Sequence, residues 1–173
     1  MKLYRAKIPV VAKEIVERLC NEGDIEVAAE NREEAERDFA AIMEEYVRRD
    51  MDLRNQIRDY MARRKIPYDQ YGRTRTRLAE ELGHPLGDDV DRFLARQFVE
   101  NLMITRFVDE IYEEDEVMYK KLIEILRSHN VDERAIREEA RNKIKNVQEG
   151  TVDYEVALQK AIKEEKKRRG LLL

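Results

Sequence analysis

One stretch of the chain decides the fold: residues 32–64 read REEAERDFAAIMEEYVRRDMDLRNQIRDYMARR. Apolar side chains recur in it at three- and four-residue steps, the spacing of one face of an α-helix. They are Ala35, Phe39, Ile42, Tyr46, Leu53, Ile57 and Tyr60. Because the step from Tyr46 to Leu53 is one heptad, the stripe predicts a helix over 32–64 without a break. Asp50 or Asp52 could instead cap a second helix, and the sequence does not decide between the two readings.

Helical spacing covers most of the remaining chain. A first helix is expected to begin at Pro9, which suits a first helical turn, and to end at Gly23. Asn31 is expected to cap the 32–64 helix, with Glu34 completing a capping box. Further helices are expected to start near Asp88 or Asp89, at the acidic run 113–116, at Asp132 and at Thr151, the last two closed by Gly150 and Gly170.

Residues 65–87 interrupt this pattern. They show no amphipathic stripe, and they hold five of the nine glycines and prolines in the chain. Such a segment is typical of a linker. The sequence therefore predicts an all-α protein of two related helical halves packed as a helical bundle, with one long helix near 32–64. The expected boundaries are 1–64 for the N-terminal half, 65–87 for a basic linker and 88–173 for the C-terminal half.

The two halves resemble each other when the chain is shifted by 83 positions. Seven residues then coincide without gaps: Val16, Glu17, Leu19, Glu30, Glu33, Arg54 and Arg58 meet Val99, Glu100, Leu102, Glu113, Glu116, Arg137 and Arg141. An internal duplication explains these matches, and would join the halves through a pseudo-two-fold contact. Two amphipathic helices that share a binary pattern explain them as well.

Four segments are similar to a known bacterial family. The run REEARNKIKNVQEGT at 137–151 resembles the signature of the DUF507 family, and MKLYRAKIPVVAKEIV at 1–16 resembles its start. DIEV at 24–27 and EEAERDFAA at 33–41 fit the same pattern. The resemblance implies a bacterial, soluble, helical protein. Because the family is one of unknown function, it implies no catalytic residue, cofactor or substrate.

Composition excludes several classes of protein. Charged residues make up 42% of the chain, with 34 Lys and Arg against 38 Asp and Glu, a net charge of −4. No apolar run approaches the length of about 18 residues that a membrane span needs. The first residues are charged and lack the apolar core of a secretory signal. The single cysteine, Cys20, cannot form an intrachain disulfide, so a reducing cytoplasm is the expected compartment.

An enzyme is not expected, and neither a cofactor nor a metal is. His84 and His129 have no second His or Cys at ligand spacing, and we interpret them as a surface loop residue and a cation at a helix end. Cys20 is expected to be a buried small hydrophobic residue. The acidic run 113–116 lacks the glycine of a calcium-binding loop. The glycines are scattered singly, so they cannot form a phosphate-binding loop.

Local charge is the strongest functional signal. The segment from Arg48 to Arg77 holds ten cations against four acids, a net of +6, with tyrosines between the cations. Tyrosines interleaved with cations suit a platform for single-stranded nucleic acid. The residues we expect to contact an anionic partner are Arg63, Arg64, Lys65, Tyr68, Tyr71, Arg73, Arg75 and Arg77.

The same segment has other interpretations. Residues 100–118 hold seven acids against Arg106 alone, so the basic segment can dock on this acidic region in its own chain or in another copy. It can also bind an anionic polymer, or be a solvated linker. The preferred function is a non-enzymatic interaction or scaffold protein of the bacterial cytosol, with an unknown protein partner or self-association. The alternative is association with nucleic acid or the ribosome through Arg48–Arg77.

Overall fold

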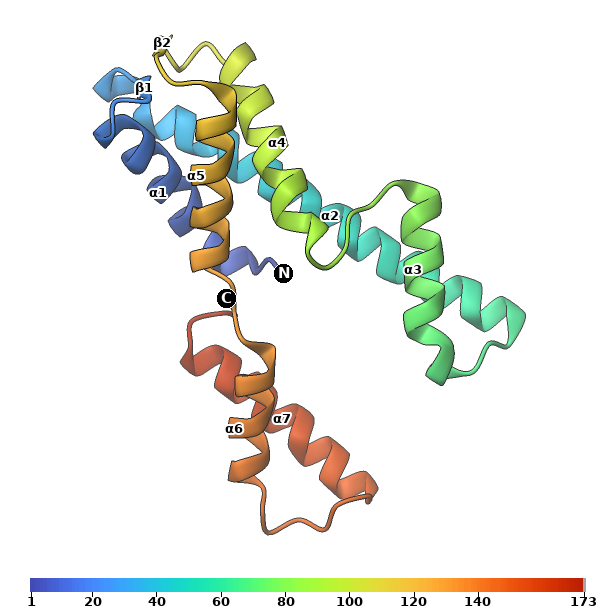
Figure 1. Cartoon of the computed structure of the whole chain (residues 1–173). Helices are drawn as coiled ribbons and strands as arrows, with labels where there is room; N and C mark the ends of the chain where they lie inside the picture. Colours follow the sequence, from blue (N-terminus) through green and yellow to red (C-terminus); the bar gives the residue numbers. More distant parts are fainter. Residues whose placement is uncertain (173) are drawn as a thin grey trace.

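The computed structural model describes residues 1–172, and helices dominate it (Figure 1). The elements run α1 (Ile8–Asn21), β1 (Ile25–Glu26), α2 (Arg32–Arg64), α3 (Tyr71–Leu82), α4 (Asp89–Ile104), β2 (Glu110–Ile111), α5 (Asp115–Ser128), α6 (Glu133–Lys143) and α7 (Val152–Arg168). The expected all-α class is therefore confirmed. The elements gather into a body and two arms.

The body consists of α1, the first half of α2, α4 and α5, whose apolar faces share one core. In this core Phe39 of α2 meets Phe98 of α4 edge to face, with ring centroids 5.3 Å apart. Both side chains are almost fully buried. Burial of one such ring contributes about 1.5–3 kcal/mol, so these aromatic residues are a large part of what holds α2 to α4.

A short ladder closes one end of the body. β1 pairs antiparallel with β2, with Ile25 opposite Ile111 and Glu26 opposite Glu110. The backbone N–H of Asp109 also donates to the carbonyl of Glu26 at 2.8 Å. The ladder joins the loop after α1 to the loop after α4, so the two helical pairs of the body are fixed to each other at this end.

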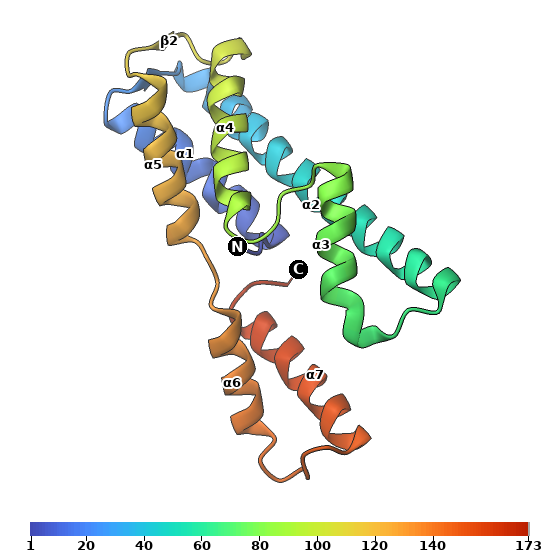
Figure 2. The same ribbon diagram turned by 45° about the vertical axis from the view of Figure 1, so that its right-hand side comes forward.

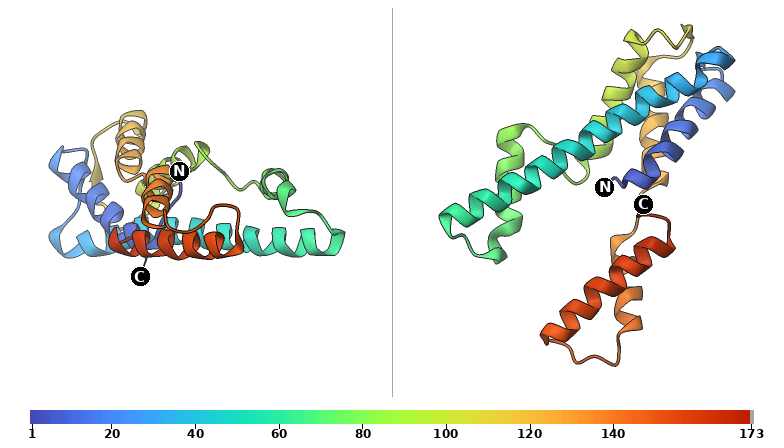
Figure 3. Two further views of the ribbon diagram at one scale, coloured as in Figure 1. Left: turned by 90° about the horizontal axis from the view of Figure 1, so that it is seen from below. Right: turned by 180° about the vertical axis from the view of Figure 1, so that it is seen from behind.

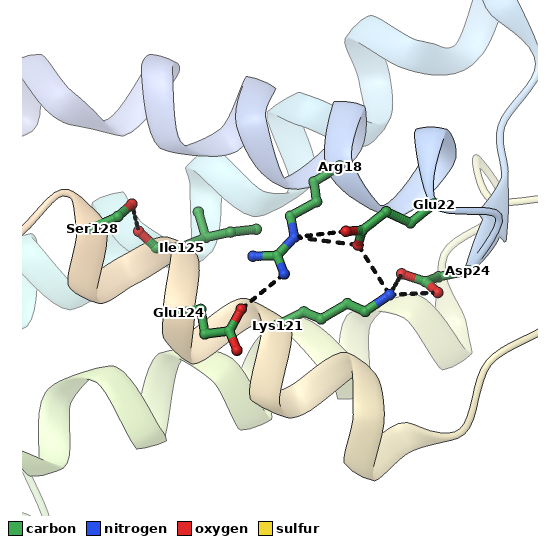
Figure 4. Close-up of polar contacts among 7 residues, drawn as sticks. All are labelled: Arg18, Glu22, Asp24, Lys121, Glu124, Ile125 and Ser128. Atoms are coloured by element: carbon green, nitrogen blue, oxygen red, sulfur yellow. Dashed lines mark hydrogen bonds and ion pairs between the residues drawn. The ribbon is translucent and has the colours of Figure 1, made fainter.

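Ion pairs join α1 to α5 along the side of the body (Figure 4). Lys121 Nζ of α5 donates to both carboxylate oxygens of Asp24, at 2.7 and 2.9 Å, and lies 3.0 Å from Glu22. Arg18 bridges Glu22 and Glu124, the latter at 2.8 Å. The hydrogen bonds to Asp24 and Glu22 raise the pKa of Lys121. Arg18 and Lys121 thus fix α5 to the end of α1.

The long helix predicted over 32–64 is confirmed as one unbroken helix, α2. Its buried stripe differs in detail from the predicted one: Met43 and Met61 face the cores, where Ile42 and Tyr60 were expected. An α-helix has 3.6 residues per turn, so a buried face drifts relative to a heptad pattern over such a length. Asp50 falls on the same face, four residues after Tyr46.

The second half of α2 and the helix α3 form the first arm. Its core contains Leu53, Ile57 and Met61 of α2 with Leu78 and Ala79 of α3. The expectation that residues 65–87 lack a helix is wrong, since α3 occupies Tyr71–Leu82. The buried face of α3 includes Thr74, whose hydroxyl donates to the carbonyl of Gln70 at 2.9 Å. A threonine in this position breaks the apolar stripe that the sequence would otherwise show.

Helices α6 and α7 form the second arm, with a core of Ala140, Tyr154, Leu158 and Ala161. Glu165 is fully buried in this arm, where its carboxylate accepts from Lys143 at 2.9 Å and from Arg169 at 2.8 Å. Tyr4, Ile136 and Leu171 make a small separate cluster where the arm meets the body. In Figure 1 both ends of the chain lie near this junction.

Two of the predicted helix starts are confirmed by their hydrogen bonds. Asp132 accepts from the backbone N–H groups of Arg134 and Ala135, and Thr151 accepts from that of Tyr154. Asn31 does stand at the N-cap position of α2, as predicted, but its side chain makes no capping hydrogen bond. Helix α6 ends at Lys143, seven residues before the glycine expected to close it.

The shift of 83 positions also relates elements of the structure. It carries α1 onto 91–104, against α4 at Asp89–Ile104, and α3 onto 154–165, inside α7. It carries α2 onto 115–147, which α5 and α6 occupy with a break between them. Both halves therefore place a helical hairpin after a body helix. The interpretation as an internal duplication stays a prediction, as do the domain boundaries at 64 and 88.

The first arm should open without the body when its core is damaged. Replacing the buried Leu53 by Ala should destabilise the arm by about 2–5 kcal/mol, because a cavity remains where the side chain packed. Hydrogen exchange should then show faster exchange in α3 while α1 and α5 keep their protection. The control is Leu82→Ala in the same arm, whose side chain is exposed and should change little. Equal loss of protection in α1 would contradict a separate arm core.

Candidate functional site

Charge is separated between the body and the arms. Residues 1–47 and 83–132 hold 13 cations and 24 acids, a net of −11. The first arm, residues 48–82, holds ten cations and six acids, a net of +4. The second arm, residues 133–172, holds 11 cations and eight acids, a net of +3. Both arms project from the body, as the right-hand view of Figure 3 shows, so two basic surfaces stand away from an acidic one.

The tip of the first arm brings together three of the residues predicted to contact a partner. Lys65 ends α2 in the left-handed conformation, with φ of 53°, which turns the chain sharply at the tip. Tyr68 follows and is 83% exposed, with its ring 5.7 Å from that of Tyr71. Lys65, Tyr68 and Tyr71 line a surface pocket of about 640 Å³, together with Arg54 and Arg58. The predicted contact of these residues with an anionic partner stays a prediction.

The other predicted residues do not join it. Arg64 lies over the ring of Tyr60, with its guanidinium carbon 3.9 Å from the ring centroid. Arg77 pairs with Glu81 one turn further along α3, at 3.1 Å. Arg75 does not line this pocket and contacts Asp50 of α2 instead.

Arg63 and Arg73 have no ion-pair partner among residues 1–172. They therefore remain available as exposed charges on the first arm, outside the pocket at its tip.

Docking of the basic segment on residues 100–118 of the same chain is not what the structure shows. The ion pairs of the first arm are made with its own helices or with the adjacent turn of α2. In Figure 1 the α3 helix and the β2 loop lie at opposite ends of the molecule. The reason is geometric, because the rigid helix α2 carries the arm away from that acidic loop.

Asp50 is the residue that fixes the first arm to the body. Its carboxylate is 16% exposed and lies 2.8 Å from Arg75 of α3, 3.3 Å from Arg54 and 3.1 Å from His84. The ring of Tyr46 stacks on His84, with centroids 4.8 Å apart. The Tyr46 hydroxyl donates to the carbonyl of Pro85 at 3.0 Å. Side chains of α2, of α3 and of the connection to α4 therefore meet at one carboxylate.

The carboxylate of Asp50 has a structural role. Burial by itself would raise the pKa of Asp50, but hydrogen bonds from Arg75 and His84 and the nearby charge of Arg54 lower it below the usual value. The interpretation of His84 as a surface loop residue is wrong, since its side chain is only 5% exposed. Sequence reasoning missed Asp50 as a site, although its place on the buried stripe of α2 was a usable signal.

Two searches of the described residues give plain results. Residues 1–172 contain no group of three or more His, Cys, Asp and Glu placed to hold a metal ion. No helix in that part of the chain is both long and apolar enough to cross a membrane.

Comparison with known families matches residues 1–171 to the pattern described as protein of unknown function, DUF507. The chain belongs to the DUF507 family. The match runs through the body and both arms, so the architecture described above is that of a DUF507 protein over nearly its whole length. A comparison with curated proteins finds none that matches this DUF507 chain.

Replacing Asp50 by Asn should loosen the first arm by about 1–3 kcal/mol at neutral pH, since Arg75 and Arg54 lose their counter-charge. The folded pKa of Asp50 is lowered, so its stabilisation is present above its unfolded value and is lost as pH falls through the folded one. The difference in stability between the wild type and the variant should therefore shrink below about pH 4. Hydrogen exchange of α3 at neutral and acid pH measures it.

The matched control is Asp52→Asn, two residues away on the exposed side of α2, where the carboxylate pairs with Arg48 at 2.8 Å. Such a surface pair is worth less than about 1 kcal/mol. An equal effect of both substitutions would show that Asp50 has no special role.

Proposed function

We propose that this DUF507 chain is a non-enzymatic interaction protein that holds an anionic partner on its two basic arms. The separation of charge supports the proposal, with −11 on the body and positive charge on each arm. Such a field steers an anionic partner toward the arms and away from the body. A single free thiol, Cys20, agrees with a reducing bacterial cytosol as its compartment.

An acidic protein surface is the first candidate partner, and a second copy of the chain carries one. The body of another copy holds the acidic residues 109–116, with six acids and no cation. Helix α2 keeps the first arm away from the acidic residues of its own chain. It does not keep the arm away from the acidic residues of a second copy, so docking between copies is geometrically allowed. In this reading the arms of one copy contact the body of the next.

Single-stranded nucleic acid is the second candidate, favoured by the tip of the first arm. Tyr68 is almost wholly exposed there, beside Lys65 and Arg58, and a protein surface gains little by exposing an aromatic ring in this way. Stacking of a base on an aromatic ring is worth about 1–3 kcal/mol, and cations nearby bind the backbone phosphates. The exposed ring of Tyr68 is therefore the observation that favours nucleic acid over an acidic protein surface.

One set of binding measurements tests the proposal. Fluorescence anisotropy would follow labelled single-stranded RNA and labelled poly-L-glutamate, and sedimentation velocity would follow self-association, each at about 50 and 300 mM salt. At least one of the three should bind at low salt and weaken at high salt. Reversing Arg58, Lys65 and Arg73 to Glu should abolish that binding, because none of them holds the fold together through an ion pair within residues 1–172.

The control reverses three cations on the body, Lys13, Arg92 and Lys120, which changes the net charge by the same amount. This control should bind nearly as the wild type does. Tyr68→Ala should weaken RNA alone, and so identifies nucleic acid as the partner. The proposal fails if no probe binds at low salt, or if body and arm reversals act alike.

A further inference from the structure

A separate pocket lies where the body and both arms meet. It has a volume of about 470 Å³, within the usual range for pockets that hold small molecules. The N-terminal segment, the middle of α2, Arg75 of α3, the connection to α4 and the last described residues all line it. Figure 2 shows both chain ends at this convergence, between the body and the two arms. The pocket shares Arg54 with the pocket at the tip of the first arm, but Lys65, Tyr68 and Tyr71 do not line it.

Part of the lining of this junction pocket is apolar. Leu3, Val47, Met51, Leu86 and Leu172 contribute to it. Met51 is half exposed and Leu172 is 36% exposed, although both face a concave surface. These apolar residues favour a ligand with a hydrocarbon part, since burial of that part releases water from the ligand and from the pocket lining.

The charged side chains of the lining include more cations than the local acid can balance. Lys2, Arg5, Arg54 and Arg75 line the pocket, with Asp50 as the one acidic lining residue. Asp50 is already shared between Arg54, Arg75 and His84. The only hydrogen bond of the Arg5 guanidinium within residues 1–172 is to the sulfur of Met51, at 3.5 Å. The charged side chains that line the pocket therefore have a net charge of +3, and no other lining side chain neutralises it.

Two further observations concern the cations at this junction. The nitrogen Nη1 of Arg75 is buried and has no hydrogen-bond partner, and buried donors of this kind are rarely left without an acceptor. Lys2 and Lys166 lie 5.1 and 5.5 Å from the centre of the same Tyr4 ring. Burial and the charge of Lys166 lower the pKa of Lys2, and the carboxylate of Glu133, which lies 3.8 Å from Lys166, opposes part of this shift.

We propose that the junction pocket binds a small amphipathic anion. Its carboxylate or phosphate head lies beside Lys2, Arg54 and Arg75, and its hydrocarbon part lies against the apolar lining residues. An arginine fork and an ammonium group are the donors that proteins use for such heads. The ligand contacts the N-terminal segment, both helices of the first arm and the tail of the second arm. Its binding therefore braces both arms against the body. This inference does not depend on what the arms bind.

Isothermal titration calorimetry of the full chain tests the pocket with four probes: octanoate, octyl phosphate, octanol and inorganic phosphate. At least one of the two amphipathic anions should bind more than about tenfold tighter than octanol and than inorganic phosphate, a difference of about 1.4 kcal/mol. The tighter of the two identifies the head group. The tighter ligand should also slow hydrogen exchange in both α3 and α7, as a bound ligand stabilises the elements it joins.

Lys2→Met and Arg54→Met should each weaken binding of the tighter anion by about tenfold or more. Neither side chain is in a core, and circular dichroism checks that the helices persist. Arg92→Met is the matched control, because Arg92 lies on α4 outside the pocket and the variant should bind as the wild type does. Three results would overturn the proposal: no binding of either anion, equal binding of octanol, or equal weakening by Arg92→Met.

Discussion

The carboxylate of Asp50 is the contact on which the arrangement of the molecule depends. It lies on the buried face of α2 between Tyr46, which ends the core of the body, and Leu53, which begins the core of the first arm. A charge so little exposed is costly unless it is paired. Arg75 and His84 supply the pairing from outside α2, so α3 and the connection to α4 must fold back onto that point. The first arm is thereby held in one direction relative to the body.

An acidic residue also joins the second arm to the body. Glu133, at the start of α6, accepts the hydroxyl of Tyr4 and lies 3.8 Å from Lys166. The shift of 83 positions places Asp50 on Glu133, so each half has an acid where its arm begins. Ion pairs such as that of Lys121 with Asp24 join helices of the body, and several cations of the body and of both arms have no ion-pair partner within the described chain.

Much of this architecture could be predicted from the sequence, because helix α2 and the caps at Asp132 and Thr151 depend on spacings within a few residues. Helix α3 was missed because Thr74 occupies its buried face and Gly72 stands in its first turn. The sequence indicated a basic segment that contains Tyr68, but it did not place this segment at the tip of a helical arm. The junction pocket was not, because Lys2, Arg54, Arg75 and Leu172 are brought together only by the tertiary fold.

Amide hydrogen exchange across residues 47–52 of the wild-type chain tests the central claim most directly. If α2 is one rigid helix held at Asp50, these amides should be protected to the same degree as those of the flanking turns, because each hydrogen-bonds within an unbroken helix. Fast exchange confined to residues 47–52, with slow exchange on both sides, would show a break in α2 and a freely moving first arm.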